Sequence, residues 1–496
     1  MSNQKGCVLH WFRNDLRLAD NPALTAAATR AADEALPLLC CFIICPEQWK
    51  QHDEAPIKLD FLRRTLWELA KALEERGNYL FLLTANTFSE VPDVLETFVK
   101  AIDAQALFFN EEYAVNEHRR DQAVAGRLLP VMRSLHSYRD QSILPVKSIR
   151  TQAGEPYKVF TPYKRSWLEL TDGSPISLWP KPPQTVTPDK PLVAAANRAA
   201  TRANTAKAID EVFAALELTD STAWAAGEDA AHDELEAFID SRAEDYDTLR
   251  DKPAVNGTSQ ISRFLANGTL SGRQCYVVAT EARRRLKAEG ASEHATKGFT
   301  TWISELIWRD FYIHLMTDNP RLSMHQPFKA DTDQLQWNDD SSGFEAWCEG
   351  RTGIPLVDAA MRQLKQTGWM HNRLRMVTAM FFTKNLFLDW RLGERYFMRN
   401  LVDGYLPSNN GGWQWSASTG TDAAPYFRVF NPVSQSRSHD PDGEFIRRFV
   451  PELADLDNKS IHDPGKAQRK ACDYPEAIVD LKTTRALAIE RFKNLG

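Results

Sequence analysis

Residues 36–45 read LPLLCCFIIC, a stretch without a single charged or amide side chain. A continuous apolar run, in contrast to one in which polar residues alternate, is typical of a β-strand that is covered on both faces. Such strands occur in parallel sheets that lie between two layers of helices. Pro37 interrupts the run, and its length is far below the ~20 residues that a membrane-spanning helix needs. The segment therefore predicts a buried strand of an α/β domain.

Strand and helix patterns alternate on both sides of this run. Further strands are expected at 6–11, 79–84 and 106–109, and helices at 21–30, 56–76, 91–102 and 116–135. Alternation of this kind builds a Rossmann-like parallel sheet, whose ligands lie at the carboxyl ends of the strands. Those ends are the loops that hold residues 13–17 and 111–117. No Gly-x-Gly-x-x-Gly follows the first strand, so the sequence does not predict a dinucleotide bound in the Rossmann manner.

The pattern changes after the sheet. Residues 172–191 contain six prolines and read as a linker that crosses between domains. From about residue 206 onward, helical patterns follow one another without a convincing strand. The predicted architecture is an α/β domain over 1–135, a connector over 136–205, a larger all-helical domain over 206–475 and a C-terminal helix or tail over 476–496.

Composition excludes several classes of protein. The seven cysteines form no Cys-x-x-Cys pair, so neither a disulfide framework nor a metal site is predicted. The chain begins without an apolar signal segment, and we expect a cytoplasmic protein that does not enter a membrane. A net charge of −6 excludes polyanion binding over the whole surface. Residues 360–400 nevertheless carry eight Lys or Arg against two Asp or Glu, which is either a solvated face or a local contact for a nucleic-acid backbone.

The helix expected at 301–316, TWISELIWRDFYIHLM, begins a region that holds eight of the 14 tryptophans. Trp302, Glu305 and Arg309 stand on one of its faces. A carboxylate between indoles on an apolar helix is costly to bury unless it is paired or used in chemistry. The alternative is an ordinary ion pair within the helix between Glu305 and Arg309, which are four residues apart.

Residues 369–384, WMHNRLRMVTAMFFTK, predict a helix with one mixed face. Asn372 and Arg375 share this face with Met376 and Phe382. A core face would be apolar, and a surface face would lack Met and Phe. A polar-lined internal cavity is therefore the hypothesis for this segment.

Two further segments contain features that suit a ligand. In 408–432 the pair Gly411 and Gly412 allows close approach of the backbone to a flat molecule, although an ordinary loop anchored by two indoles gives the same pattern. Segment 258–262, TSQIS, offers hydroxyls that suit a phosphate, although Ser and Thr also cap helices without any ligand.

Six segments, taken together and in this order, closely resemble the photolyase/cryptochrome family, and within it the class I cyclobutane pyrimidine dimer photolyases. They are WFRNDLRLADNPAL (11–24), YKVFTPYKRSW (157–167), GTSQISRFLANGTLS (257–271), WISELIWRDFY (302–312), GWMHNRLRM (368–376) and NNGGWQWSASTGTDAAPYFRVFNP (409–432). Several long motifs at consistent spacing over nearly the whole chain make this resemblance far more specific than any single pattern above.

The resemblance implies that the helical domain binds a U-shaped FAD, which is active in its reduced form. The missing dinucleotide motif agrees with this cofactor site. The positions that match the family's flavin site are Tyr246, Thr258, Ser259, Gln260, Ile261, Ser262, Trp302, Arg309, Asn372, Arg375, Asp403 and Asn409. Asn409 would face the flavin N5, and Asp403 would pair with Arg375.

The resemblance also implies an activity, the light-dependent repair of cyclobutane pyrimidine dimers in single- or double-stranded DNA. Excited, reduced FAD donates an electron to a dimer flipped out of the DNA, the ring splits and the electron returns. Glu305, Asn372 and Asn409 would be catalytic, with Glu305 bonded to the thymine carbonyl where negative charge develops. The matching substrate positions are Arg250, Glu305, Trp308, Arg373, Met376, Trp415 and Arg428. The matching electron path from the surface is Trp337, Trp390 and Trp413.

The alternative on the same fold is a blue-light photoreceptor of the cryptochrome type that signals to a protein partner. Six-four photolyases and animal cryptochromes carry histidines where this chain has Asn372 and Met376, which favours the cyclobutane branch. No extended tail follows residue 475, and we read this as further weight against a photoreceptor. A thermal flavin oxidoreductase is not favoured, since no nicotinamide motif is present.

The chain departs from the family pattern at two places. Tyr405 stands where the family usually has an aspartate that contacts the flavin. Asn116 and Glu117 match members that bind folate, so 5,10-methenyltetrahydrofolate is the expected antenna chromophore. A lysine expected near Met324 is absent, which leaves a different chromophore as the alternative. We expect the protein to act as a monomer.

Overall fold

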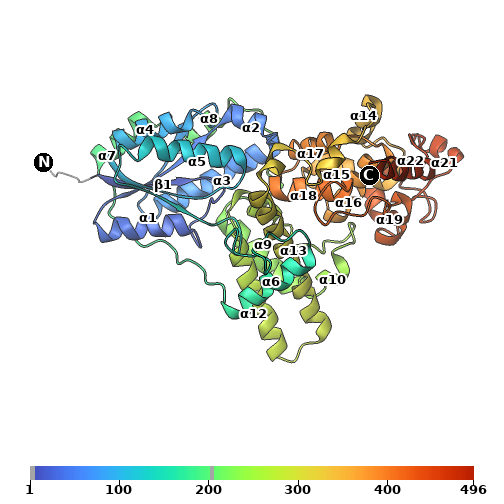
Figure 1. Cartoon of the computed structure of the whole chain (residues 1–496), viewed down its shortest axis with the longest axis horizontal. Coiled ribbons are helices and arrows are strands. Elements are labelled where there is room, and N and C mark those ends of the chain that lie inside the picture. Colours follow the sequence, from blue (N-terminus) through green and yellow to red (C-terminus); the bar gives the residue numbers. More distant parts are fainter. Residues whose placement is uncertain (1–5, 201–205, 496) are drawn as a thin grey trace.

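The computed structural model describes residues 6–200 and 206–495. A parallel α/β domain and a helical domain lie side by side along the long axis of the molecule (Figure 1). The five strands are β1 Cys7–Phe12, β2 Leu38–Ile44, β3 Leu80–Thr84, β4 Ala104–Asn110 and β5 Ser134–Tyr138, in the order β3-β2-β1-β4-β5 with all neighbours parallel. The prediction of a Rossmann-like sheet beside an all-helical domain is confirmed.

The apolar run over residues 36–45 forms β2, and both faces of this strand are buried as predicted. Its even-numbered residues, such as Cys40 and Phe42, pack into one core, and its odd-numbered residues, such as Leu39 and Cys41, pack into the other. The helices that follow the first four strands are α1 Pro22–Asp33, α2 Pro46–Gln51, α3 Pro56–Glu74, α4 Val91–Ala101 and α5 Val115–Leu128. Figure 1 shows α1 on one side of the sheet and α4 with α5 on the other.

The edge strand β5 was not predicted, and the helix expected to reach residue 135 ends at Leu128. The sequence of β5 is SLHSY, and none of its residues is fully buried. A short edge strand without an apolar run gives no periodic signal, so residues 134–138 resembled the end of a helix.

The connector first leaves the α/β domain and then returns to it. Helix α6, Phe160–Gly173, packs against the helical domain, whereas α7, Lys190–Ala199, packs on α4. Helix α8, Ala206–Phe213, packs on α3, and Ile209 and Phe213 belong to the core of the α/β domain. The core of the α/β domain therefore continues past residue 206, where we placed the start of the helical domain.

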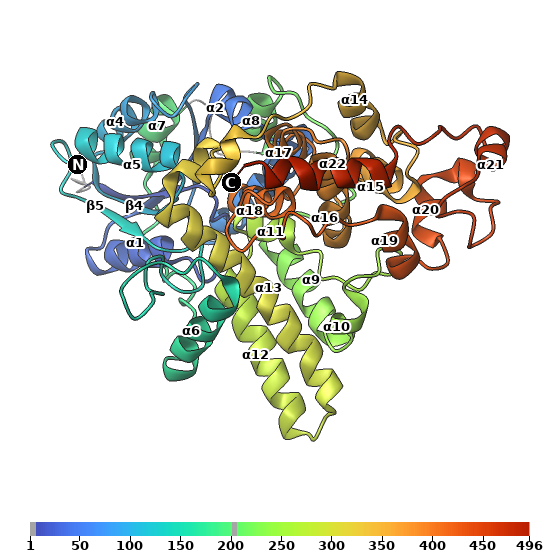
Figure 2. The same cartoon turned by 45° about the vertical axis from the view of Figure 1, so that its right-hand side comes forward.

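The helical domain contains α9 Glu228–Ser241, α10 Tyr246–Leu249, α11 Ser262–Asn267, α12 Gly272–Ala288, α13 Glu293–Asp318, α14 Ser341–Glu349, α15 Pro355–Thr367, α16 Asn372–Met380, α17 Trp390–Met398, α18 Leu406–Ala417, α19 Pro432–His439, α20 Glu444–Phe449, α21 Lys466–Ala471 and α22 Leu481–Lys493. Helices α12 and α13 project together as a hairpin (Figure 2). Among the described helices, none combines the length and the apolar character that crossing a bilayer requires.

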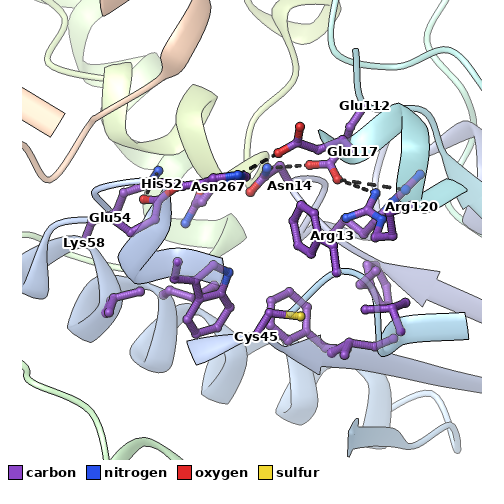
Figure 3. Close-up of a pocket in the computed structure, with 18 of the residues that line it drawn as sticks. Arg13, Asn14, Cys45, His52, Glu54, Lys58, Glu112, Glu117, Arg120 and Asn267 are labelled. Atoms are coloured by element: carbon purple, nitrogen blue, oxygen red, sulfur yellow. Dashed lines mark hydrogen bonds and ion pairs between the residues drawn. The ribbon is translucent and has the colours of Figure 1, made fainter. Parts of the chain in front are cut away.

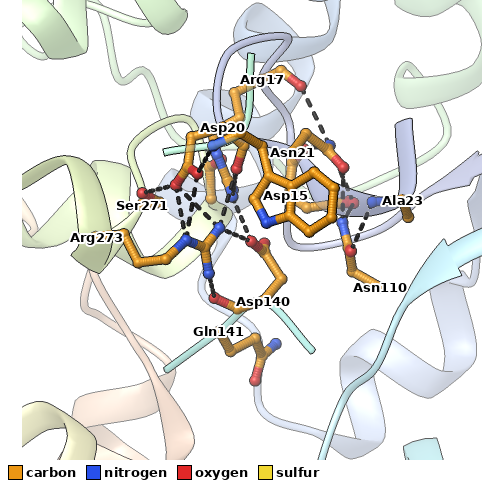
Figure 4. Close-up of polar contacts among 12 residues, drawn as sticks. Asp15, Arg17, Asp20, Asn21, Ala23, Asn110, Asp140, Gln141, Ser271 and Arg273 are labelled. Carbon is orange, nitrogen blue, oxygen red and sulfur yellow. Dashed lines mark hydrogen bonds and ion pairs between the residues drawn. The ribbon is translucent and has the colours of Figure 1, made fainter. Parts of the chain in front are cut away.

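A buried polar junction joins the two domains (Figure 4). Asp140, which follows β5, accepts from the Arg17 guanidinium at 2.5 Å and from Arg273 of α12 at 2.6 Å. Asp20 accepts from the Ser271 hydroxyl at 2.6 Å and pairs with Arg273 at 2.9 Å. All five side chains are buried. The loop after β1 was expected to face a ligand, but its Arg17 end binds the other domain instead.

Candidate functional site

A cavity with an empty volume of about 570 Å³ lies between α16, α18 and the segment that follows α17. We name it the α16–α18 cavity. Its wall consists of Asn372, Arg375, Met376, Ala379, Phe397, Leu401, Asp403, Tyr405, Ser408, Asn409, Gly412, Trp413 and Ser416. The wall thus mixes amides and an ion pair with apolar side chains, which confirms the polar-lined cavity predicted from the mixed face of 369–384.

Arg375 and Asp403 form the ion pair that the resemblance implied. An Arg375 Nη2 lies 2.8 Å from an Asp403 oxygen, and the Arg375 Nε donates to the Met370 carbonyl at 2.8 Å. The Asp403 side chain is almost fully buried, whereas that of Arg375 is about one-quarter exposed. The pair therefore fixes the direction of the guanidinium along the cavity wall.

Asn409 on α18 is held by a hydrogen bond to the neighbouring helix α17. Its Nδ2 donates to the carbonyl of Glu394 on α17 at 2.9 Å, and its amide oxygen accepts no hydrogen bond from the residues that the structure describes. The side chain of Asn372 makes no hydrogen bond within residues 6–200 and 206–495. Two amides with spare hydrogen-bonding capacity suit the polar edge of a heteroaromatic ring system.

The two glycines of α18 have different roles. A Cβ on Gly411 would lie 2.2 Å from the Tyr312 ring, so this glycine allows α18 to pack on α13. A Cβ on Gly412 would meet nothing within 4 Å, and Gly412 lines the cavity. The prediction of close approach to a ligand is therefore wrong for Gly411 and fits Gly412. The segment is helical over Leu406–Ala417, so the ordinary-loop alternative is also wrong.

Glu305 on α13 pairs with Arg250, with 2.5 Å between an Nη1 and an Oε1. Arg309 donates instead to the carbonyls of Gln141 and Leu265, so the ion pair considered within the helix is absent. Burial raises the pKa of Glu305, and the Arg250 charge only partly opposes that rise. The carboxyl group therefore holds a proton at higher pH than an exposed glutamate does.

Trp308 and Phe160 form a stacked aromatic platform beside Glu305. Their ring centroids lie 3.5 Å apart, and the rings are nearly parallel at 7°. Phe160 comes from the connector, and sequence reasoning did not single it out although it lies in the quoted YKVFTPYKRSW motif. Trp415 faces Phe430 at 6.4 Å, and Met376 lies in the cavity wall.

The remaining flavin positions implied by the resemblance surround α10, α11 and α13. The Ser259 hydroxyl accepts from the Trp302 indole at 3.3 Å, and Gln260 has a positive φ of 53°. Helix α11 begins after Ile261, and no side chain caps it. The alternative that the hydroxyls of 258–262 cap a helix is therefore wrong. Thr258, Ser262 and Tyr246 lie in the same region, and Tyr246 is buried against Phe238.

The three tryptophans of the implied electron path share one apolar core. Trp413 lies in the wall of the α16–α18 cavity, and its ring occupies the space that a Cβ on Gly393 would take, at 2.1 Å. Gly393 is one turn along α17 from the buried Trp390. Trp337 is only partly buried and packs on Phe387 at 4.9 Å. The series thus runs from the cavity toward the surface.

The basic stretch over 360–400 is not a free cationic face. Its members pair with acids from elsewhere or are buried, as follows: Arg362 with Glu452, Lys365 with Glu349, Arg373 with Asp251, Arg375 with Asp403, Arg391 with Asp333 and Asp389, and Arg395 and Arg399 with Asp53, while Lys384 is buried on Ala417 and Ser418. Apart from Asp389, the compensating acids lie outside residues 360–400, so counting charge within that window overestimated the patch. Arg428 is exposed and makes no ion pair in the described chain.

Two further cavities lie at the carboxyl ends of the strands, and they share lining residues such as His52 and Glu117. The sheet-end cavity has an empty volume of about 820 Å³ and is lined by Trp11, Arg13, Cys45, Trp49 and their neighbours (Figure 3). The interdomain cleft, of about 1350 Å³, is lined by residues of both domains, including Asn116, Glu117 and Met324. Both strand-end loops reach these cavities, through Asn14 and Glu112, and that ligands bind there stays a prediction.

Asn116 and Glu117 meet at His52. The Asn116 amide nitrogen lies 3.0 Å from His52 Nε2, and a Glu117 oxygen lies 3.6 Å from His52 Nδ1. Burial raises the pKa of Glu117, so its carboxyl keeps a proton to higher pH than an exposed glutamate does and is suited to donating to a polar ring edge. Met324, the position that lacks the expected lysine, is exposed at the rim of the cleft.

A parallel α/β domain joined to a helical domain, whose polar cavity is backed by buried indoles, defines a two-domain class of cofactor-binding proteins. The model of the FAD binding domain of DNA photolyase matches residues 302–494, and the DNA photolyase model matches residues 8–186. The chain belongs to the DNA photolyase family.

Individual relatives agree over the full length. The deoxyribodipyrimidine photo-lyase of Vibrio cholerae is 42% identical over 493 residues, with 98% of this chain and 99% of that protein covered. The enzyme of the same name from Escherichia coli is 41% identical over 489 residues, with 98% of each covered. The crystal structure of a class III photolyase from Agrobacterium tumefaciens superimposes with a TM-score of 0.84 at 31% identity and covers 100% of this chain and 98% of that one.

Proposed function

We propose that this protein repairs cyclobutane pyrimidine dimers in DNA by light-driven electron transfer, as a deoxyribodipyrimidine photo-lyase. One observation carries the proposal: the Arg375–Asp403 pair, the two amides Asn372 and Asn409 and the buried Trp413 share one cavity wall. That arrangement fits an isoalloxazine ring, which needs hydrogen-bonding groups at its polar edge and aromatic or apolar contacts over its faces. Because the substrate is DNA, we propose that the protein acts in the bacterial cytosol. We also propose that it acts as a monomer.

The residues present fit FAD. Gly412 leaves open space at the cavity wall, and the Asn372 side chain there makes no hydrogen bond to the described residues, so the cavity has room and an unused amide. Arg375, Asp403 and Asn409 would hold the ring system, and Ser259, Gln260 and Ser262 would bind the rest of the molecule. When bound and reduced, the flavin supplies the electron that light makes available.

The chain's own contribution to ring splitting is electrostatic. Glu305 has a raised pKa and is therefore able to donate a hydrogen bond to a carbonyl that becomes negatively charged. The Arg250 guanidinium lies 2.5 Å from the Glu305 carboxyl group and fixes its position in the pocket. Trp308, stacked on Phe160, offers a flat apolar surface for the bases of a dimer that is flipped out of the DNA.

The experiment is a repair assay on irradiated DNA. Purified protein with reduced flavin should remove thymine dimers under blue light and should not do so in the dark. A protein that photoreduces its flavin yet shows no preference for irradiated over intact DNA, at a stated salt concentration, would be the photoreceptor of the alternative hypothesis. Failure of repair with reduced flavin bound would contradict the proposal.

We propose 5,10-methenyltetrahydrofolate as the antenna chromophore, bound in the interdomain cleft at Asn116 and Glu117. A near-ultraviolet shoulder beside the flavin bands should be present in the purified protein and should be lost in Glu117→Gln with the flavin bands unchanged. A longer-wavelength band would instead indicate a deazaflavin, for which the aromatic sheet-end cavity is the better fit. Because Glu117 lines both cavities and Asn116 lines only the interdomain cleft, Asn116→Ala separates the two sites.

A further inference from the structure

Two consecutive residues at the end of α10 form ion pairs with two different helices. Helix α10 packs on α13 (Figure 2), and the chain leaves it through Arg250 and Asp251. Arg250 pairs with Glu305 of α13, whereas Asp251 pairs with Arg373 of α16. Glu305 belongs to the proposed substrate pocket, and Arg373 directly follows Asn372 of the cavity wall. The Asp251–Arg373 pair therefore lies at the edge of the proposed site.

The contact between Asp251 and Arg373 uses both oxygens of the carboxylate. The Arg373 Nε lies 3.2 Å from one Asp251 oxygen, and an Arg373 Nη2 lies 2.9 Å from the other. A guanidinium that is bound at two points is fixed in direction as well as paired in charge. The Asp251 side chain is 37% exposed and that of Arg373 is 17% exposed, so the pair is open to solvent on one side. An anion that arrives from solvent can therefore compete with Asp251 for this guanidinium.

The groups that surround the pair leave Asp251 ionised. Partial burial acts to raise the pKa of Asp251, but the hydrogen bond and the charge of Arg373 outweigh burial and hold that pKa below its usual value. The Arg250 charge and His439 at the end of α19 act in the same direction. Burial lowers the pKa of the His439 imidazole, so this ring is uncharged at neutral pH. A full negative charge therefore occupies the guanidinium that the family resemblance assigns to the DNA backbone.

We propose that Asp251 is a positioning residue for DNA selection, which keeps Arg373 from binding intact DNA and releases it to a phosphate beside a flipped dimer. Intact duplex is bound through its backbone alone, and its phosphates meet a guanidinium that already has an anionic partner. A dimer inside the pocket adds contacts to its bases and brings the neighbouring phosphates to the edge of the site. Arg373 then exchanges one anion for another. The inference rests on the proposed function.

The test is a salt series of binding constants for irradiated and intact duplex DNA of one sequence, measured with the flavin-loaded protein in the dark. In the wild type, the slope of log K against log salt should be steeper for irradiated DNA, because only that DNA has Arg373 on a phosphate. Asp251→Asn keeps the shape of the side chain and removes its charge, so Arg373 becomes available to intact DNA as well. The difference between the two slopes should then shrink by about 0.9, the contribution of one phosphate contact, and the affinity for intact DNA should rise.

A slope difference that Asp251→Asn leaves unchanged would overturn the proposal, since a purely structural role alters the binding of both DNAs alike. The control Asp245→Asn removes an exposed carboxylate from the same segment and should change neither slope. If Asp251→Asn fails to fold, Arg373→Gln should reduce the slope by about 0.9 for irradiated DNA alone, and equal changes for both DNAs would also overturn the proposal. Failure of the proposed function has a different signature, because the wild type would then bind irradiated and intact DNA equally well.

Discussion

The domain junction and the α16–α18 cavity both contain arginine and aspartate side chains, but the two regions differ in how completely their polar groups are hydrogen-bonded. At the junction the Arg273 guanidinium donates to Asp20 and Asp140 through both side-chain and main-chain oxygens. In the wall of the α16–α18 cavity the side chain of Asn372 makes no hydrogen bond to any residue that the structure describes. The Arg273 guanidinium is thus paired with carboxylates of the other domain, whereas the amides of the cavity wall keep hydrogen-bonding capacity that a ligand would use.

The first and largest expected effect tests the junction half of this comparison. Arg273→Ala leaves Asp20 and Asp140 buried beside each other without this cation, which typically costs about 3–5 kcal/mol of unfolding free energy. Urea denaturation of the flavin-loaded protein measures it. The matched control Arg127→Ala removes an exposed pair with Asp93 and Glu96 and should cost less than about 1 kcal/mol. Similar losses in both variants would contradict the role assigned to the junction.

The second prediction concerns the electron path that begins in the cavity. Trp337→Phe should remove most of the rate at which light reduces oxidised flavin, because Trp337 is the member nearest the surface. Repair by chemically reduced enzyme should be unchanged. Laser-flash absorbance and the repair assay measure the two rates. Trp67→Phe, on α3 of the other domain, serves as the control. Parallel loss of both activities would show that the indole serves only packing.

The third prediction concerns the protonation state of Glu305 in the proposed substrate pocket. Burial raises the pKa of Glu305, so the protonated donor persists below that pKa and is lost as pH rises through it. Repair per absorbed photon should therefore fall several-fold on the alkaline side. Glu305→Gln, which donates at every pH, should flatten the profile. The exposed Glu293→Gln on the same helix should keep the wild-type profile. A profile that Glu305→Gln leaves unaltered would exclude this role.

The smallest effect is expected at the exposed rim. Arg428 makes no ion pair in the described chain, so Arg428→Ala should weaken binding to irradiated DNA only modestly. It should also reduce the slope of log K against log salt by about 0.9, the contribution of one phosphate contact. Fluorescence anisotropy over a salt series measures both. Arg119→Ala, an exposed arginine on α5, should change neither. An unchanged slope in Arg428→Ala would place this arginine outside the DNA contact.

Local patterns predicted the parts of the molecule in which neighbours in sequence are also neighbours in space. The doubly buried β2 and the mixed face of α16 are of this kind, since one strand or one helix face carries the whole signal. The β5 strand was missed because an edge strand has little apolar periodicity. The motif resemblance supplied candidate residues, such as Arg375 and Asp403, that no periodicity connects.

Predictions that depended on distant partners were the ones that failed. The carboxylates that neutralise the basic stretch over 360–400, such as Asp53 and Asp251, lie far away in sequence. Glu305 likewise pairs with Arg250 rather than with Arg309 on its own helix. The role of Gly411 became clear only from Tyr312 on α13. Each of these contacts is set by tertiary packing, which a single sequence does not display.

The buried junction also has an optical consequence. Energy passing between two pigments falls steeply as they separate and depends on how their transition dipoles are inclined. With Arg17, Asp140 and Arg273 interlocked out of water, the strand-end cavities and the α16–α18 cavity keep one mutual geometry. An antenna chromophore held in a strand-end cavity would then keep a fixed distance and inclination to a flavin in the α16–α18 cavity.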